Sequence, residues 1–254
     1  MLIDVHAHIW GSSYEQDKRA IIKSCELYGI SQVYVSGLRS YVPDEQEIKE
    51  LNREVYRFAR EEEGIIKGYC YVNPGHRNCL DVLKQGIEEY GMSGMKLWVS
   101  TLCDDTRVFP LVERCIEYDI PVLVHAFHKA VGQLPYESYS WNVANLARKY
   151  PKVRIIMAHM AANCYTGLKS IRDLKNVWVD FSGSIIRGDD ILYAKKVLGA
   201  DRILFGTDMP GASPLVCLGQ VEEADLTSEE KERICYRNAM RLFAGKPLGE
   251  ESSC

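Results

Sequence analysis

The chain has 254 residues, a formal net charge of −4 at pH 7, 46% hydrophobic residues and 26% charged residues. Its acidic and basic residues are interspersed, so neither a basic stripe for nucleic acid nor a polybasic segment for a membrane surface is present. No apolar run approaches the roughly 18 residues that span a bilayer, and no basic region followed by an apolar core opens the chain as in a secretory signal. We therefore expect a cytoplasmic protein that binds neither nucleic acid nor membrane.

The first predicted strand, residues 2–9, carries two of the six histidines in the chain. Side chains alternate along a strand, so we expect Asp4, His6 and His8 to share one face. The two histidines would then stand about 6.6 Å apart at Cα, close enough for both imidazoles to bind one ion. The alternative is an edge strand with one polar face. Two histidines on one face of an otherwise apolar strand favour the metal site.

The rest of the chain alternates predicted strands and helices. Further strands are expected at residues 31–37, 65–72, 94–99, 121–127, 153–159, 177–182 and 202–208. Helices are expected at residues 15–28, 44–62, 78–90, 107–118, 140–149, 167–174 and 189–198, and two more begin near Val216 and Thr227. Eight such units favour parallel strands with crossovers of one hand, and the length matches the ~250 residues of a (β/α)8 barrel. We predict an α/β protein, a single-domain (β/α)8 TIM barrel over residues 1–254.

Four histidines and one aspartate lie at or near the carboxyl ends of predicted strands. His6 and His8 are on the first strand, His125 on the fifth, His159 on the sixth and Asp208 on the eighth. In a (β/α)8 barrel these strand ends meet at one rim, where the active site lies. Several imidazoles and one carboxylate suit a first-row divalent ion. Packing does not explain why four histidines and an aspartate all stand at equivalent strand ends, so the pattern predicts a metal in the active site.

These motifs resemble those of the amidohydrolase superfamily. Residues 4–8 resemble the D-x-H-x-H motif with which members of that superfamily open. His125 and residues 158–159, 206–210 and 238–243 resemble further landmarks of the superfamily. The fourth strand, with Gly-Met-Lys-Leu-Trp at residues 94–98, places the chain closest to the amidohydrolase-related (amidohydrolase 2) branch, which contains the aminocarboxymuconate-semialdehyde decarboxylase-like proteins. The resemblance runs the full length, and the ordered set across four strands makes it specific.

The resemblance implies a site built around one catalytic divalent metal, for which zinc is favoured. His6, His8, His125 and Asp208 would bind this ion. His159 would stand beside it as a base or electrophile, and Asp208 would add proton transfer to its role as ligand. Zinc lowers the pKa of bound water to about 7 and polarises a carbonyl oxygen, so such a site can activate water at neutral pH.

Lys96 is a third catalytic candidate, because an unpaired charge inside a barrel strand is costly unless the amine reaches the active-site mouth. Related enzymes with two metals carry a carbamylated lysine on the fourth strand, and there His125 and His159 bind the second ion. The residues around Lys96 resemble the branch in which one metal is usual, so one metal is favoured over two. The alternative is that the Lys96 ammonium reaches solvent while the methylene groups of the side chain pack in the core.

Trp98, His128 and Arg187 are the candidate substrate-binding residues. Trp98 follows the fourth strand and could stack on a planar substrate, although a plain core tryptophan is equally expected. Arg187, and Arg39 after the second strand, are cations suited to gripping a carboxylate, yet most arginines are solvated surface residues. The long loop at residues 129–140 suits a lid or a self-packed surface loop.

The nine cysteines include no C-x-x-C pair, so neither a zinc ribbon nor a thioredoxin-like motif is present. Without a secretory signal, we expect free and mostly buried thiols that serve packing. Cys164, five residues past His159, is the single candidate for a place near the site, and burial is the commoner outcome there.

Three functions were weighed from these residues. The favoured one is a metal-dependent hydrolase that cleaves an amide, lactone or ester carbonyl bond of a small, carboxylated molecule by metal-activated water. The alternative is a metal-dependent, non-oxidative decarboxylase of an aromatic or conjugated carboxylic acid, which an aromatic and cationic pocket lining would favour. The third is a binding module with a structural metal, disfavoured because every expected ligand position is filled. A homo-oligomer is compatible with the sequence but not indicated by it.

Overall fold

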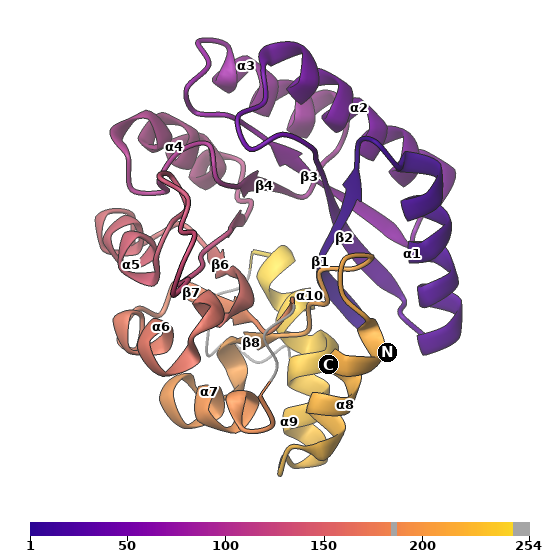
Figure 1. Cartoon of the computed structure of the whole chain (residues 1–254), viewed down its shortest axis with the longest axis vertical. Coiled ribbons are helices and arrows are strands. Elements are labelled where there is room, and N and C mark those ends of the chain that lie inside the picture. Colours follow the sequence, from indigo (N-terminus) through magenta and orange to yellow (C-terminus); the bar gives the residue numbers. More distant parts are fainter. Residues whose placement is uncertain (184–186, 246–254) are drawn as a thin grey trace.

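The computed structural model describes residues 1–183 and 187–245, and shows a ring of strands surrounded by helices (Figure 1). The strands are β1 (Ile3–Trp10), β2 (Gln32–Leu38), β3 (Ile66–Tyr71), β4 (Gly94–Leu97), β5 (Val122–Val124), β6 (Ile155–Met157), β7 (Val177–Asp180) and β8 (Ile203–Leu204). They pair in chain order, each parallel to the next. The predicted succession of eight parallel strands is therefore confirmed.

The barrel closes where β1 meets the chain that follows β8. Val5 N donates to Phe205 O at 3.0 Å, and Asp208 N donates to His6 O at 2.7 Å. A third bond runs from His8 N to Met209 O at 2.9 Å. These bonds continue the parallel pairing around the ring, so the first and last strands become neighbours. The predicted TIM barrel is confirmed.

The helices are α1 (Tyr14–Tyr28), α2 (Glu45–Glu61), α3 (Cys79–Lys84), α4 (Phe109–Glu117), α5 (Ser140–Lys149), α6 (Cys164–Ser170), α7 (Asp190–Leu198), α8 (Pro214–Glu223), α9 (Ser228–Glu232) and α10 (Asn238–Phe243). Helices α1 to α9 lie outside the ring, and α10 lies near its centre (Figure 1). The helix expected at residues 167–174 was placed too late. The Asn163 side chain accepts a hydrogen bond from Thr166 N and begins α6 upstream of that range.

In the part of the chain that the structure describes, two helices continue as wider π turns and three segments form short 3-10 turns. The π turns, Gln85–Glu89 after α3 and Arg233–Arg237 after α9, extend their helices; the 3-10 turns are Thr106–Val108, Ala158–Ala162 and Ala200–Arg202. Among the described helices, none combines the length and apolar character that crossing a membrane requires.

The side-chain alternation of β1 changes partway along the strand. Ile3 and Val5 pack in the cluster inside the barrel, whereas Ala7 and Ile9 pack in the outer cluster against the helices. The register with β2 shifts between Asp4 and Ala7, which accounts for the change. The expectation that Asp4 shares a face with both histidines was therefore wrong, because strict alternation ends at this irregularity.

The cluster inside the barrel is closed at one end by the last helix. It contains Ile3, Val5, Tyr34, Tyr69, Leu123, Ile156, Ala158, Trp178, Leu204, Ala239 and Leu242. Phe243 of α10 stacks on Tyr34 at 3.7 Å between ring centroids. In Figure 1, α10 lies near the centre of the ring of strands. Because apolar side chains fill this end, the polar side chains of the site gather toward the other.

Candidate active site

Three predicted ligands from opposite ends of the chain meet at the rim. His6 Nε2 lies 3.0 Å from His8 Nε2, and His8 Nε2 lies 3.2 Å from Asp208 Oδ1. His6 Nε2 is 3.9 Å from the same carboxylate oxygen. The closure of β1 against the chain after β8 brings these side chains together. Asp208 itself has a positive φ of 66°, a conformation that Asp tolerates better than most residues.

The outer nitrogens of both β1 histidines are already bonded. His6 Nδ1 donates to Asp180 Oδ2 at 3.0 Å, and His8 Nδ1 lies 2.9 Å from Ser36 Oγ. These contacts fix the rings and leave both Nε2 atoms directed at Asp208. Burial, followed by the charge of Lys96, lowers the pKa of His6 to about 3. His6 is therefore neutral at pH 7, which is the form that binds a metal.

Asp4 joins the two closing strands and does not face the ion site. Its carboxylate accepts hydrogen bonds from His6 N at 2.9 Å, Thr207 N at 3.1 Å and Thr207 Oγ1 at 2.5 Å. Burial raises the pKa of Asp4 to about 7 despite these bonds. The aspartate of the D-x-H-x-H motif thus clasps β1 to the segment that carries Asp208.

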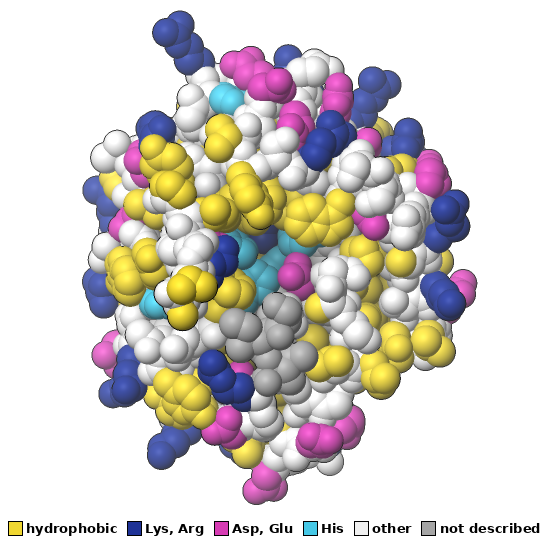
Figure 2. All heavy atoms as spheres, in the orientation of Figure 1, with side chains coloured by type: hydrophobic (Ala, Val, Ile, Leu, Met, Phe, Trp, Pro, Cys, Tyr) yellow, Lys and Arg dark blue, Asp and Glu magenta, His cyan; other side chains and the backbone are white. Residues whose placement is uncertain are grey.

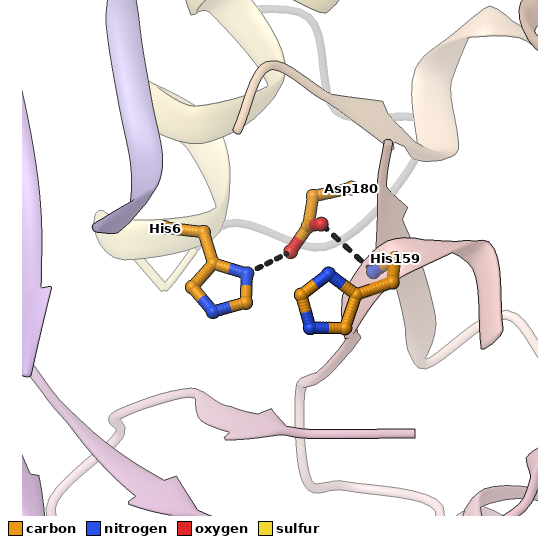
Figure 3. Close-up of side chains that lie close together, drawn as sticks. All are labelled: His6, His159 and Asp180. Atoms are coloured by element: carbon orange, nitrogen blue, oxygen red, sulfur yellow. Dashed lines mark hydrogen bonds and ion pairs between the residues drawn. The ribbon is translucent and has the colours of Figure 1, made fainter. Parts of the chain in front are cut away.

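Asp180, the last residue of β7, lies between His6 and His159 (Figure 3). One carboxylate oxygen accepts from His6 Nδ1, and the other accepts from His159 N at 2.9 Å. Ser182 Oγ also donates to this carboxylate at 2.5 Å. Burial opposes ionisation of Asp180, but the hydrogen bonds it accepts from His6 Nδ1 and Ser182 Oγ outweigh burial and hold the pKa below its ordinary value.

Among the described residues, two groups of His, Asp, Glu or Cys side chains have ligand atoms within 4.8 Å of one another: His6, His8 and Asp208, and His6, His159 and Asp180. In the second group, the Asp180 oxygens are occupied by the hydrogen bonds just described. In the first group, both histidine Nε2 atoms and a carboxylate oxygen face one point, as a divalent ion requires. The residues present therefore fit a metal, and the first group is the better ligand set.

Lys96 lies beneath this group and is fully buried. Its Nζ atom is 3.1 Å from His6 Nε2. Burial lowers the pKa of Lys96 to about 8, although the charges of Asp208 and Asp180 oppose the shift. The solvent-reaching alternative is excluded by this burial. Because His6 Nε2 has one lone pair, the Lys96 amine and a metal ion compete for it.

His125 and His159 form a pair beside the ligand group. His125 Nδ1 lies 3.1 Å from His159 Nε2, and His125 Nε2 lies 2.9 Å from Glu137 Oε1. His159 Nδ1 donates to Ser182 O at 3.1 Å. The structure thus brings His125 to the rim, but both of its ring nitrogens are directed at other partners and not at the group of His6, His8 and Asp208.

A left-handed turn follows β6 and positions His159. Four consecutive residues, His159, Met160, Ala161 and Ala162, have φ between 45° and 60°. None of them is glycine, and this region costs L-residues roughly 1–2 kcal/mol each. Strain of this kind persists where surrounding contacts fix the backbone. Here the bond from His159 N to Asp180 fixes its first residue.

A cavity of about 160 Å³ opens over these side chains. Its described walls are His8, Trp10, Leu38, Tyr41, Trp98, Val99, His125, Lys129, Leu134, Glu137, His159 and Asp208. Figure 2 shows histidines at the bottom of this hollow, with hydrophobic side chains along its border. Trp98 is 6.0 Å from Trp10 and 5.3 Å from Tyr41 between ring centroids, so aromatic rings form one wall.

The other predicted rim residues lie elsewhere. Arg187 NH1 is 3.8 Å from Asp190 Oδ1, and Arg187 is not among the described residues that line the cavity. His128 Nε2 bonds to Ser140, where it supports the start of α5. Arg39 donates to Gly11 O and Glu50. The buried Cys164 thiol donates to Asp190 at 3.0 Å and serves packing.

Sequence reasoning missed Trp10, Lys129, Glu137 and Asp180. Trp10 stands two residues past His8, so the same alternation predicts its direction. Asp180 ends β7 at the same rim as the other site residues, so its position at a strand end could have identified it as a site residue. Lys129 and Glu137 belong to the loop between β5 and α5, where no periodicity identifies which side chains turn inward.

The fold and the ligand set together define a metal-binding (β/α)8 barrel with a polar rim. The model of the amidohydrolase family matches residues 3–245, so the chain belongs to that family. The predicted relationship to the amidohydrolase 2 branch is thereby confirmed. Among curated proteins, none matches the chain by sequence.

Solved structures with the same fold are similar at low identity. The 2,6-dihydroxybenzoate decarboxylase of Rhizobium has 16% identity and a TM-score of 0.76, covering 96% of this chain and 98% of that one. A dihydroxybenzoic acid decarboxylase of Polaromonas sp. JS666, with bound manganese and the inhibitor 2-nitroresorcinol, has 16% identity and a TM-score of 0.76, covering 96% of both chains. The 5-carboxyvanillate decarboxylase of Sphingomonas paucimobilis has 13% identity and a TM-score of 0.75, covering 96% and 98%.

The favoured expectation of a hydrolase is contradicted by these comparisons. The similar structures are mostly decarboxylases of aromatic acids, which agrees with the alternative weighed from the sequence. The sequence motifs did not separate the two because one metal-ligand set serves both reactions. What differs is the lining of the cavity, which depends on loops.

Proposed function

We propose that this protein is a metal-dependent, non-oxidative decarboxylase of a small aromatic or conjugated carboxylic acid. The observation that carries the proposal is the cavity wall of Trp10, Tyr41 and Trp98 above the group of His6, His8 and Asp208. Flat aromatic faces favour a planar ligand. The names of the similar structures support the same substrate class.

One divalent ion would be held by His6, His8 and Asp208, and by His125 if its ring turns from Glu137. The imidazole-rich set suits zinc, and manganese is the ion bound in the similar Polaromonas enzyme. When bound, the ion would polarise an acidic oxygen of the substrate as a Lewis acid. We propose one ion, because His125 and His159 are directed at each other and not at Lys96.

The chain's own residues would orient the acid and supply a proton. Decarboxylation breaks the bond between the ring and the carboxylate carbon, releases CO2 and requires one proton at the ring carbon. His159 suits this role, because it lines the cavity and its Nδ1 is held by Ser182 O; it would take up a proton from water at Nε2 and pass it to the ring carbon. Asp208 is held ionised, since its bond and charge contacts with His8 outweigh burial and keep the pKa below its ordinary value.

Lys96 would place a positive charge beside the proposed metal ligands. Its amine contacts His6 Nε2, so an ion bound there must displace this hydrogen bond. A buried ammonium at that position would favour an anionic substrate. The aromatic rings exclude water from the reacting carboxylate, which loses its charge as CO2 forms.

The test is CO2 release by protein loaded with Mn²⁺ or Zn²⁺ and incubated with 2,6-dihydroxybenzoate and 5-carboxyvanillate. We expect bicarbonate to form and the aromatic product to appear in equal amounts. His159→Ala should keep one ion per chain and lower turnover by roughly 10²-fold or more. His76→Ala, in the turn after β3, is the matched control and should retain activity.

Two results would contradict the proposal. A panel of aromatic and conjugated acids that yields no CO2 from stoichiometrically loaded protein would exclude the reaction. Loss of metal from His159→Ala would instead indicate two ions, with His159 as a ligand.

A further inference from the structure

We infer that Lys129 binds a second anionic group on the substrate, so that the site selects planar acids with two anionic groups over those with one. The inference rests on the proposed function, because it assumes that the group of His6, His8 and Asp208 holds the first acidic group. It names a specificity residue that the sequence motifs did not indicate.

Lys129 is the cation of the cavity wall. It lies in the loop between β5 and α5 and is the sole lysine or arginine among the described residues that line the cavity. Its side chain is 31% exposed, so the ammonium is neither enclosed nor free in solvent. The proposed ion offsets the charge of Asp208, and Lys129 offsets that of Glu137, so an anionic ligand can approach this side of the cavity.

Glu137 holds the ammonium in place. Lys129 Nζ lies 2.8 Å from Glu137 Oε1, and the Glu137 side chain is 2% exposed. The carboxylate also contacts His125 Nε2 at 2.9 Å and accepts from Leu134 N at 3.2 Å. An ammonium has three N–H donors, and one is directed at Glu137. The other two are available to a ligand in the cavity that Lys129 lines.

The loop that carries Lys129 is tied together internally. Lys129 N donates to Gln133 Oε1 at 2.9 Å, and Gln133 Nε2 donates to Phe127 O at 3.0 Å. Lys129 Nζ also stands 5.6 Å from the centroid of the Phe127 ring. A side chain that is already fixed in position loses little conformational entropy when a ligand binds. Lys129 is therefore better suited to bind an anion than a mobile surface lysine.

The opposing explanation is that Lys129 only neutralises the buried Glu137. In that case Lys129→Met weakens anion binding indirectly, because it leaves an unpaired carboxylate at the cavity. The double variant Lys129→Met/Glu137→Gln separates the two explanations. If Lys129 binds the ligand, the double variant stays weak; if it only neutralises Glu137, the double variant recovers.

The experiment is calorimetric titration of the metal-loaded protein with benzoate, isophthalate and terephthalate. We expect at least one dicarboxylate to bind wild-type protein roughly tenfold more tightly than benzoate, as one hydrogen bond between charged groups provides. Lys129→Met should abolish this preference without changing benzoate affinity. Lys129→Arg should retain most of it, and added salt should reduce it.

Lys195→Met is the matched control. Lys195 Nζ also lies 2.8 Å from a glutamate, Glu230, and its side chain is 33% exposed, but it is on α7 away from the cavity. This variant should keep the dicarboxylate preference. Thermal unfolding of each variant shows that it is folded before titration.

Three outcomes would overturn the inference: equal affinity for the mono- and dicarboxylates in wild-type protein, a preference that survives Lys129→Met, or recovery in the double variant. CO2 release from the panel of aromatic and conjugated acids, 5-carboxyvanillate included, is measured on the same samples and tests the proposed function separately. Dicarboxylate binding without CO2 release supports Lys129 while refuting the reaction. CO2 release without a dicarboxylate preference supports the reaction while refuting the role of Lys129.

Discussion

Asp180 is the residue on which two predicted site histidines depend. Its carboxylate accepts from the His6 ring and from the backbone of His159, so it positions a ligand and the proposed proton donor together (Figure 3). A carboxylate behind a ligating histidine also raises the basicity of the ring. Asp180 would thus couple the proposed ion to the proposed proton transfer by holding His6 and His159, and it is not among the described residues that line the cavity.

We expect Asp180→Asn to weaken metal binding by roughly 10- to 100-fold, the usual cost of losing such a partner. The amide removes the negative charge that stabilises the polarised His6 ring. Competition with a chelator measures the affinity of purified protein for Zn²⁺ and Mn²⁺. Asp201→Asn, which alters a surface ion pair with Arg233, is the control and should leave affinity unchanged. Equal affinity in both variants would remove Asp180 from the metal site.

The left-handed turn after β6 predicts a position that tolerates glycine. Ala162 has φ of 59°, where alanine loses roughly 1–2 kcal/mol and glycine loses none. Glycine adds about 0.5–1 kcal/mol of unfolded-state entropy and removes a buried methyl worth about 0.8 kcal/mol, so Ala162→Gly should change stability by less than about 1 kcal/mol. Ala158→Gly, at a fully buried position before the positive-φ run, relieves no strain and should lower stability by about 1–2 kcal/mol. Thermal unfolding measures both variants, and equal losses of Tm would show that the turn is not strained.

Among the elements, α10 connects the end of the chain to the inside of the barrel. Leu242 is fully buried in the inner cluster, while Met240 on the same helix is 51% exposed. The helix therefore seals the end of the barrel away from the metal ligands. Its role is to support the fold and not to contact a substrate.

Leu242→Ala should destabilise the protein by about 2–5 kcal/mol, because it removes buried methyl groups and leaves a cavity. Metal stoichiometry should stay the same, since the ligands lie at the opposite end. Urea unfolding gives the free-energy change, and Met240→Ala should alter it by less than about 0.5 kcal/mol. Similar effects of the two variants would mean that α10 does not plug the barrel.

Strand β1 shows where pattern reasoning at the element scale succeeded and failed. The apolar run and the paired histidines predicted a strand that points two imidazoles at the site, and it does so. The same alternation placed Asp4 beside them, but the register shift between Asp4 and Ala7 reverses it. Such a register shift depends on how β1 pairs with β2, so residues 2–9 alone cannot predict it.

Across the whole molecule, burial in the barrel determines the behaviour of the thiols. The described cysteines are free, and six of these eight are buried. Burial raises the pKa of Cys70 to about 12 and that of Cys103 to about 12. The ordinary thiol pKa is near 9, so between these values the unfolded chain releases protons that the folded chain keeps.

The thiols' contribution to stability is therefore fully retained below pH 9 and should fall as the pH rises toward 12. Each fully buried thiol contributes about 1.4 kcal/mol of loss per pH unit in this window. Urea midpoints between pH 8 and pH 10.5 measure the decline. Cys70→Ala should be less stable at pH 8 yet lose less as the pH rises, because it lacks one of these groups. A parallel decline in both proteins would contradict the assignment.

The sequence by itself determined the fold and most of the metal-ligand candidates. Strand and helix periodicities are local properties, and eight repeats of one unit leave few topologies, so a TIM barrel followed from the pattern. His6, His8 and Asp208 were predictable because carboxyl ends of parallel strands share one rim.

Only the tertiary structure decided what surrounds that rim. Lys129, Glu137 and Trp10 border the cavity, while Arg187 and His128 bond to other residues. The direction of a loop side chain depends on partners far away in sequence, as the contact of Glu137 with His125 illustrates. The same reason explains why the expected hydrolase gave way to the proposed decarboxylase: strand ends fix the candidate metal ligands, whereas loops shape the substrate pocket.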